Sequence, residues 1–492
     1  GQLLAGGYYD AGSRNRGFLT KLLDSGGRDL NFGAAGILVS SQPNYRDEIH
    51  GLSLAADGKF LTAGSADLDF QVTRHASDGS PDESFGDGGR AQVSFGVSDE
   101  SVQAMLLQPD GKIVAAGNSS GGDSVPCAAI SRRNPDGSPD LSFGVAGSVT
   151  RPLGLFGGSI AAAALQSDGK IVLAGSIIPE WSEELCVLRF LPNGSADPSF
   201  GVDGMVITGA QATYENAHAI AVQPDGKIVV TGRTYLNGIT DLLVCRYLEN
   251  GTLDPSFSGD GMATADLGLS EETAYCLALQ LDGKILVGGG GGGSNGFAHL
   301  ALARFTEQGE LDPEFSGDGM LATPLGLGSA LANALAPLPD GRIVVAGNSW
   351  NGSNNDVVIA RLLNNGSPDP TFSDDGVLRV ARTHGSEDVL EAVFPQHDGS
   401  LLAAGRFSVG TTGGFGTLRV REDGELHLPH GTNGLALVPP GIINEYLTSA
   451  AIQKDGPPVL IRIDTSAGHG AGTALSKMID KTADEWAFLE AV

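Results

Sequence analysis

Basic residues, aromatic residues, cysteines and long apolar runs are all scarce in this chain of 492 residues. The 30 lysines and arginines face 58 acids, so the net charge is -28, which disfavours binding to nucleic acid or to an anionic membrane surface. No apolar run approaches the roughly 20 residues of a membrane-spanning helix, so we expect no membrane insertion. The cysteines are scattered through apolar stretches, unlike a disulfide framework or a zinc site, and we expect four buried thiols: Cys127, Cys186, Cys245 and Cys276.

Glycine, in contrast, is abundant, with 73 residues, about twice its usual share of roughly 7%. There is no collagen period, so this glycine indicates many tight turns between short strands. We expect no signal peptide within this sequence. Gly1 lies inside a repeat unit, an observation compatible with a missing natural N-terminus.

A repeat of about 57 residues runs through the chain in several parallel series. Asp-Gly pairs recur at intervals of 53 to 58 residues. A phenylalanine series and a basic series keep the same phase, and an acid follows each base by eight residues, except in the eighth unit, where His427 stands. The hairpin aspartates are Asp57, Asp110, Asp168, Asp225, Asp282, Asp340, Asp398 and Asp455; the phenylalanines are Phe32, Phe85, Phe143, Phe200, Phe257, Phe315 and Phe372; the bases are Lys21, Arg74, Arg132, Arg189, Arg246, Arg304, Arg361 and Arg419.

Each unit has the pattern of four short strands. In the fifth unit, the apolar run 219–223 is followed by the hairpin signal Asp225-Gly226, a valine-rich strand, a loop, a third strand at 242–247 and a last strand near Met262. Four strands repeated eight times predict an all-β, eight-bladed β-propeller with four-stranded blades. The alternative is an open solenoid, which needs capping units at both ends.

The two ends of the chain favour the closed ring. Residues 1–7 match the second strand of a unit, and residues 447–455 match the first strand. One blade is therefore expected to be shared between the N- and C-terminal strands, which removes the open edges of the ring. We assign residues 1–456 to the propeller and residues 457–492 to a short C-terminal strand–loop–helix appendage, and we expect a monomer.

The repeat resembles a known bacterial family. Segments such as Val222-Gln223-Pro224-Asp225-Gly226-Lys227-Ile228 and Leu253-Asp254-Pro255-Ser256-Phe257 are similar to the delta-60 repeat, and the resemblance covers about residues 1–456. It implies a propeller-like fold and a secreted or cell-surface bacterial protein. The family's activity is poorly defined, so the resemblance implies architecture rather than a reaction.

The recurrent bases, acids and phenylalanines favour a structural interpretation. A residue that the blade geometry requires recurs in every blade, whereas a ligand site needs it once. We therefore expect each base–acid pair to stabilise its own blade, and each phenylalanine to pack between blades. A binding role for the base–acid pairs is the alternative.

A further series lies ten residues before each hairpin aspartate, and six of its eight members are acidic. The acids shortly precede an alanine-rich strand, whose small side chains suit the narrow centre of a propeller. They are therefore candidates for a ring of carboxylates that holds Ca²⁺ or another hard cation. We favour the alternative, in which each acid accepts backbone N–H groups between blades, because two positions of the ring are not acidic. The acids are Asp47, Glu100, Glu215, Glu272, Asp388 and Glu445.

The loops after the second strand of each unit vary most in sequence and carry aromatic residues. Because they occupy the same loop of successive units, they are expected to share one rim. Variable loops on a rigid scaffold commonly bind ligands, and exposed aromatic rings suit proteins, peptides or glycans. The alternative is that these rings pack inward as loop anchors. The candidates are Tyr8, Tyr9, Trp181, Tyr235, Phe297, Trp350 and Phe407.

The eighth unit departs from the others, with His427-Leu428-Pro429-His430 where they have Asp-Pro-Ser-Phe. A His-x-x-His pair can bind a metal, but no third ligand with matching spacing appears. We favour sequence drift in a terminal blade.

The period stops after Gly456. Residues 458–464 have the pattern of a strand, a small-residue loop follows, and a helix is expected from Thr473. Asp464-Thr465 and Ala467-Gly468-His469-Gly470-Ala471-Gly472 resemble the C-terminus of the prolyl oligopeptidase family, which implies a catalytic base at His469.

Gly292-Gly293-Ser294-Asn295-Gly296 has the lettering of that family's nucleophile segment, but it lies in a loop between blade strands. No segment resembles the family's acid loop, and no stretch is left for its hydrolase domain of about 200 residues. We therefore predict a non-catalytic binding or scaffold module with no required cofactor. A serine peptidase that uses Ser294 and His469, or a remnant of one, is the alternative.

Overall fold

Seven of the eight predicted Asp-Gly pairs, from Asp57 to Asp398, form the tight turn between the first two strands of a unit, as predicted, whereas Asp455-Gly456 lies outside the described residues. In the fifth unit, the N–H of Gly226 donates to the carbonyl of Gln223 at 2.9 Å, and Asp225 Oδ1 accepts the N–H of Lys227 at 3.1 Å. Gly226 has a φ of +89°, a conformation that residues with a side chain rarely adopt. Aspartate and glycine together therefore specify this hairpin.

These observations come from a computed structural model. It describes residues 2–10, 15–39, 47–55, 57–96, 100–120, 125–154, 156–179, 182–209, 214–236, 238–293, 298–323, 325, 329–381, 387–409, 412–437, 445–453, 459–464 and 471–472. Within these ranges every regular element is a β-strand. No helix long and apolar enough to cross a membrane is found in the described part of the chain.

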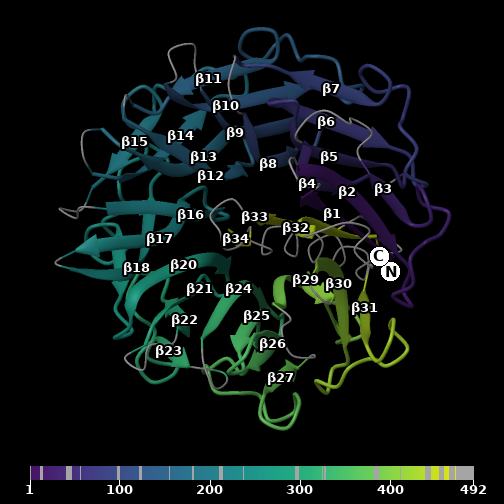
Figure 1. Ribbon diagram of the computed structural model, residues 1–492. Coiled ribbons are helices and arrows are strands. Elements are labelled where there is room, and N and C mark those ends of the chain that lie inside the picture. Colours follow the sequence, from purple (N-terminus) through teal and green to yellow (C-terminus); the bar gives the residue numbers. More distant parts are fainter. Residues whose placement is uncertain are drawn as a thin grey trace, which may run out of the picture.

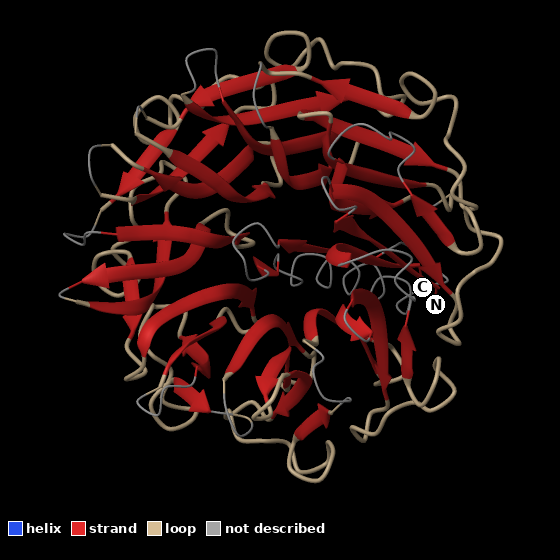
Figure 2. Cartoon of the chain, viewed as in Figure 1, coloured by secondary structure: helices blue, strands red, loops and turns tan. Residues whose placement is uncertain are grey.

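The strands form eight antiparallel blades arranged around a central axis (Figures 1 and 2), which confirms the predicted eight-bladed propeller and excludes the open solenoid. Blade 1 contains β32 (Glu445–Gln453), β1 (Gln2–Asp10), β2 (Asn15–Leu22) and β3 (Ile37–Val39). Blade 2 contains β4 (Asp47–Leu54), β5 (Phe60–Ala66), β6 (Asp69–His75) and β7 (Arg90–Val93). Blade 3 contains β8 (Ser101–Leu107), β9 (Ile113–Ser120), β10 (Pro126–Arg133) and β11 (Ser148–Pro152). Blade 4 contains β12 (Gly158–Leu165), β13 (Ile171–Ile177), β14 (Glu184–Phe190) and β15 (Met205–Thr208).

The second half of the ring repeats this arrangement, and in blades 2 to 8 the first strand lies nearest the axis (Figure 1). Blade 5 contains β16 (Tyr214–Val222), β17 (Ile228–Leu236), β18 (Ile239–Tyr247) and β19 (Met262–Ala265). Blade 6 contains β20 (Ser270–Leu279), β21 (Ile285–Gly292), β22 (Ala298–Phe305) and β23 (Met320–Thr323). Blade 7 contains β24 (Ala330–Pro337), β25 (Ile343–Trp350), β26 (Asn355–Leu362) and β27 (Val377–Val380). Blade 8 contains β28 (Val389–Pro395), β29 (Leu401–Val409), β30 (Thr412–Val420) and β31 (Leu435–Leu437).

The ring is closed by the two ends of the chain, as predicted. Strand β32 pairs antiparallel with β1, with Leu3 opposite Ile452 and Ala5 opposite Ala450. On the other side of this blade, the N–H of Gly431 in blade 8 donates to the carbonyl of Ser25 in blade 1 at 2.6 Å. Blade 1 is therefore joined to blade 8 by the same kind of contact that joins the other blades.

The core lies in layers between neighbouring blades, and one recurring cluster, which we call the brace, is embedded in it. In blade 5, Arg246 Nε donates to Asp254 Oδ2 at 2.8 Å, and the guanidinium lies 4.6 Å from the centre of the Phe257 ring. The same guanidinium donates to the carbonyl of Glu307 in blade 6. The brace therefore stabilises its own blade and joins it to the next, which confirms the structural interpretation. Phenylalanines of this series that are 0% exposed are Phe32, Phe85, Phe143, Phe200, Phe257, Phe315 and Phe372.

The four cysteines are buried and no disulfide joins them, which confirms the expected thiols. Beyond the propeller repeat, β33 (Val459–Asp464) pairs antiparallel with β32 and extends the sheet of blade 1 toward the axis. Strand β34 (Ala471–Gly472) pairs with β33 and lies beside β20 and β24 (Figure 1). The predicted strand before Asp464 is thus β33, whereas the helix expected from Thr473 lies outside the described residues.

Candidate functional site

The two faces of the propeller differ in chemistry. Because successive strands of a blade are antiparallel, the Asp-Gly hairpins and the corners that carry the phenylalanines lie on one face, which we call the turn face. The connections from second to third strand, and from each blade to the next, lie on the opposite loop face. The turn face repeats the same turns and braces in successive blades. Differences between blades that concern a ligand are therefore expected on the loop face or around the axis.

Each innermost strand contains a β-bulge at the same place. In blade 5, Ala217 is opposite Gly232 and Ala219 is opposite Thr231, so His218 is the extra residue of the bulge. A Cβ added to Gly232 would lie 1.9 Å from the carbonyl oxygen of Asn216, so only glycine permits this approach. Glycine recurs at this position in blades 2 to 8, and an added Cβ would lie 1.8 to 2.0 Å from the carbonyl oxygen across the ladder in each case. These glycines are Gly64, Gly117, Gly175, Gly232, Gly289, Gly347 and Gly405.

The bulged residues surround the axis, because they occupy equivalent places on neighbouring innermost strands. They lie seven residues before each hairpin aspartate, and their identity changes from blade to blade. The residues next to them are mostly alanine or glycine. Variation at one position of a constant scaffold is typical of ligand recognition. We call this set the bulge ring: His50, Gln103, Ala161, His218, Tyr275, Asn333, Glu391 and Thr448, whose side chain lies outside the described ones.

Some neighbouring members of the bulge ring contact each other, or the backbone beside each other, across the boundary between two blades. The rings of His218 and Tyr275 meet edge to face, with centroids 5.7 Å apart. Asn333 Nδ2 donates to the carbonyl of Leu390, the residue before Glu391, at 3.0 Å. Burial raises the pKa of Glu391 to about 7, although the charge of Arg406 acts in the opposite direction. Glu391 can therefore either donate or accept a proton near neutral pH.

The acidic series lies three residues before the bulge ring, and those of its side chains that the structure describes are buried. Glu100 Oε1 accepts the N–H of Phe95 at 2.6 Å, and Glu272 Oε1 accepts the N–H of Leu269 at 2.8 Å. Asp388 Oδ1 accepts the N–H of Ser408 at 2.8 Å. Glu100 and Glu272 therefore accept N–H groups of the loop that leads into their blade, and Asp388 accepts an N–H group of the second strand of its own blade. For the series as a whole, N–H groups accepted between blades remain a prediction.

Three other members of the series differ in their surroundings. Glu215 is 1% exposed and accepts a hydrogen bond from Thr234 Oγ1 at 3.3 Å. Asp47 lines a cavity between blades 1 and 2. The side chain of Glu445 lies outside the described ones.

Burial dominates the electrostatics of these carboxyl groups. It raises the pKa of Asp47 to about 6, with the charge of Arg90 opposing the shift. It raises the pKa of Glu100 and of Glu272 to about 7, although both accept backbone hydrogen bonds that act to lower it. Glu100 and Glu272 are therefore only partly charged at neutral pH, which weakens them as ligands for a cation.

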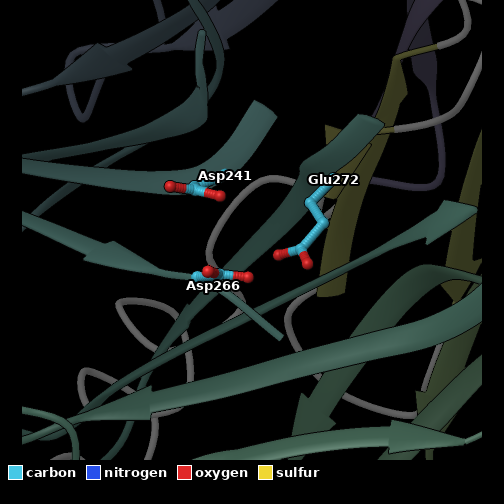
Figure 3. A group of neighbouring side chains, drawn as sticks. All are labelled: Asp241, Asp266 and Glu272. Atoms are coloured by element: carbon cyan, nitrogen blue, oxygen red, sulfur yellow. The ribbon is translucent and has the colours of Figure 1, made fainter. Parts of the chain in front are cut away.

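One group of three carboxylates is nevertheless brought together. Oxygens of Asp241, Asp266 and Glu272 lie within 4.8 Å of one another, at the loop-face end of the boundary between blades 5 and 6 (Figure 3). Carboxylate oxygens are the ligands that Ca²⁺ prefers. In the described part of the chain this is the only group of three or more potential metal ligands. Of the predicted acidic ring, it therefore contains Glu272 alone.

The aromatic residues of the predicted rim differ in how exposed they are. Tyr235 is 37% exposed and meets Tyr214, its cross-strand neighbour, edge to face, with ring centroids 6.1 Å apart. Tyr8 and Trp350 are half-buried.

Other rim candidates are turned inward or are not described. Tyr9 is 3% exposed and Phe407 is 0% exposed, because both rings pack into the core between blades 1 and 8. Their side chains therefore belong to the core rather than to an exposed surface. Trp181 and Phe297 lie outside the described residues. Sequence reasoning did not identify Tyr214, which the cross-strand register places beside Tyr235.

The remaining candidates concern metal binding and hydrolysis. His430 occupies the place of the brace phenylalanine, is 3% exposed, and its Nε2 lies 2.9 Å from Thr417 Oγ1. His427 and His430 belong to no group of three potential ligands in the described part. Ser294 and His469, the peptidase candidates, both lie outside the described residues, so their mutual geometry is not defined.

Comparison with known proteins identifies the repeat. Five segments of the chain match one family model. It is described as a domain of unknown function, the DUF5122 beta-propeller, and the matched residues are 108–143, 166–200, 223–257, 280–315 and 338–372. The matched segments cover less than half of the chain and lie within blades 3 to 7, each spanning a hairpin and its phenylalanine corner. A comparison with curated proteins found no match.

Solved structures with low similarity also match. A PL25 ulvan lyase matches at 14% identity and a TM-score of 0.40, covering 76% of this chain and 91% of the lyase. Sqt1 of Chaetomium thermophilum matches at 12% identity and a TM-score of 0.42, covering 81% of this chain and 88% of Sqt1. At these sequence identities and TM-scores, the matches do not indicate a function for this chain.

Proposed function

We propose that this chain is a non-catalytic binding module that recognises a protein, peptide or glycan on its loop face, around the axis. It acts as part of a secreted or cell-surface bacterial protein, a location suggested by the resemblance to delta-60 repeats. The observation that carries the proposal is the bulge ring. Eight equivalent positions differ in side chain while the braces, turns and glycines around them recur.

Exposed tyrosines support the loop face as the contact surface. Tyr214 is 49% exposed and Tyr235 is 37% exposed, and they form a pair at the loop-face end of blade 5. Tyrosine supplies a large contact area at a small cost in conformational entropy, together with a hydroxyl group for hydrogen bonds. A pair of exposed rings therefore suits the apolar face of a sugar or a peptide side chain.

The net charge and the closed ring bear on the kind of ligand and on the oligomeric state. A net charge of -28 disfavours nucleic acid and favours a neutral or basic ligand. The closed ring leaves no blade-edge strand unpaired at the junction of the two ends, which supports a monomer. The proposal includes no resident cofactor, and Ca²⁺ at the Asp241, Asp266 and Glu272 group is its alternative.

The proposal is tested by screening the whole chain on glycan and peptide arrays, then measuring the affinity of the strongest ligand for variants. We expect the combined Tyr214→Ala and Tyr235→Ala variant, and separately His218→Leu, to bind at least tenfold more weakly. Leu281→Ala is the matched control, because Leu281 is 66% exposed in a hairpin on the turn face. Equal weakening by the Leu281 variant, or none by the loop-face variants, would contradict the proposal.

A further inference from the structure

The boundary between blades 1 and 2 encloses a cavity of about 190 Å³. For scale, an engineered protein cavity of about 150 Å³ holds a benzene molecule. Leu19 and Leu38 of blade 1 and Ile49 of blade 2 form its apolar wall. The rest of the lining consists largely of polar groups of blade 2: hydroxyl, amide, imidazole and charged side chains. The cavity therefore has an apolar wall and a polar wall.

The polar wall is a local departure from the repeat. Four blade 2 residues that line the cavity, Thr62, Gln71, Thr73 and His75, lie on β5 and β6. In the other blades, most side chains at these places are apolar. The register of blade 5 places Val230, Leu243, Cys245 and Tyr247, all 0% exposed, at the same positions. The cavity therefore exists because blade 2 exchanges core side chains for polar ones.

A directed chain of hydrogen bonds crosses this wall. His75 Nδ1 lies 3.2 Å from the carbonyl of Gly79, which can only accept, so this nitrogen carries the proton. Burial lowers the pKa of His75, which favours the neutral ring, and Nε2 is then an acceptor for the Thr73 hydroxyl at 2.7 Å. Thr73 Oγ1 in turn accepts from Thr62 Oγ1 at 2.6 Å.

This direction determines what the hydroxyl groups can offer a ligand. The hydroxyl protons of Thr62 and Thr73 are both donated to hydrogen bonds between these side chains and His75. The two hydroxyl oxygens can therefore only accept hydrogen bonds from a ligand. The His75 ring is held in place by stacking on Phe60, with centroids 4.9 Å apart and planes 10° apart. A ligand must therefore donate hydrogen bonds to this part of the wall.

The rest of the wall supplies donors as well as acceptors. Arg90 and the Gln71 amide line the cavity and can donate, while the Asp47 carboxylate can accept. Ser65 Oγ is buried and has no hydrogen-bond partner among the described residues. A hydroxyl group donates and accepts at one atom, so several hydroxyls on a short carbon chain satisfy this wall.

We propose that this cavity binds a small neutral polyol or sugar of about six to ten non-hydrogen atoms, whose C–H face packs on Leu19, Leu38 and Ile49. Its hydroxyls donate to Thr62 and Thr73 and exchange hydrogen bonds with the remaining polar wall. This site is separate from the loop-face site and does not rest on the function proposed above.

The test is saturation-transfer NMR and isothermal titration of the whole chain with glycerol, erythritol and xylitol. L-alanine serves as a zwitterionic probe of similar size and 1-butanol as an apolar one. Direct binding is measured rather than melting temperature, because polyols stabilise folded proteins by exclusion from their surface. We expect saturable binding of at least one polyol, and at least tenfold weaker binding of both comparison probes.

Variants assign that binding to the cavity. Thr73→Val interrupts the chain of hydroxyls, and the combination Thr62→Val, Gln71→Leu, Thr73→Cys and His75→Tyr installs the blade 5 side chains. Both are expected to weaken polyol binding at least tenfold, and the single variant decides if the combination does not fold. Thr231→Val is the control, because Thr231 Oγ1 is a buried hydroxyl in blade 5 that donates to the carbonyl of Leu243 at 2.7 Å. No saturable polyol binding, tighter binding of alanine or butanol, or undiminished polyol binding by Thr73→Val would overturn the proposal.

Discussion

Removing the acid from one brace is expected to destabilise the propeller strongly. Arg189 is 0% exposed, and its Nε donates to Asp197 Oδ2 at 2.8 Å. Asp197 Oδ1 also accepts the N–H of Ser199 at 2.9 Å and its hydroxyl at 2.6 Å. Asp197→Ala therefore leaves a guanidinium buried without its counter-charge.

The expected loss is about 3–5 kcal/mol in the free energy of unfolding at pH 7, the cost of breaking a buried ion pair by removing one partner. Combining Asp197→Ala with Arg189→Met removes the stranded charge, so the double variant should be less destabilised than Asp197→Ala alone. Urea unfolding followed by circular dichroism measures both, with the slope of the transition compared to check that the unfolding process is unchanged.

The control is an ion pair on the surface. Arg421 Nη2 lies 2.8 Å from Asp423 Oδ2, and the two side chains are 51% and 55% exposed. Arg421→Met should change the free energy of unfolding by no more than about 0.5 kcal/mol, because water already stabilises both charges. If Asp197→Ala costs less than about 1 kcal/mol, the brace is no stronger than a surface pair and the reasoning is refuted.

We expect four further outcomes. The pKa of Glu391 is raised to about 7 in the folded state, against about 4.3 for an unperturbed glutamate. The folded state therefore binds this proton more tightly, and the stability that the proton contributes at low pH is lost as the pH rises from about 4 to about 7. Glu391→Gln should flatten the fall in unfolding free energy over this range, and an unchanged slope argues against it. Deleting residues 1–6 exposes an edge of β32 and should cause association or a lower melting temperature, whereas a monomer with unchanged melting would contradict the closure. Calcium should give no saturable rise in melting temperature; a rise that Glu272→Gln abolishes would establish a cation site. Purified protein should not hydrolyse a proline-containing chromogenic peptide, and activity lost in both Ser294→Ala and His469→Ala would show the opposite.

The fold was predictable because its constraints recur in nearly every unit. An Asp-Gly hairpin, a base and acid eight residues apart, and a buried phenylalanine each have a local physical role, so these series, kept in phase along the chain, specify eight blades. The closing blade was readable for the same reason, since residues 1–7 and 447–455 are complementary fragments of one unit. The structural role of the brace could be predicted for the same reason, because a residue that packing requires is required in each blade.

The site was harder to predict because it resides in differences rather than in repetition. The bulge depends on the close approach of Gly232 to a carbonyl across the ladder, which the letters alone do not reveal. The signal was nevertheless present, as varied residues seven positions before each hairpin aspartate. Exposure of the aromatic rim was not readable either, because a ring such as Phe407 can turn into the core or outward from the same loop.

The most direct test of the account is hydrogen–deuterium exchange of the whole chain with and without the strongest array ligand. The account predicts slower exchange in the innermost strands around the bulge ring and at the loop-face ends of β16 and β17. Exchange in the Asp-Gly hairpins of the turn face should be unchanged. Protection confined to the turn face, or spread equally over both faces, would contradict the claim that the ligand is recognised on the loop face.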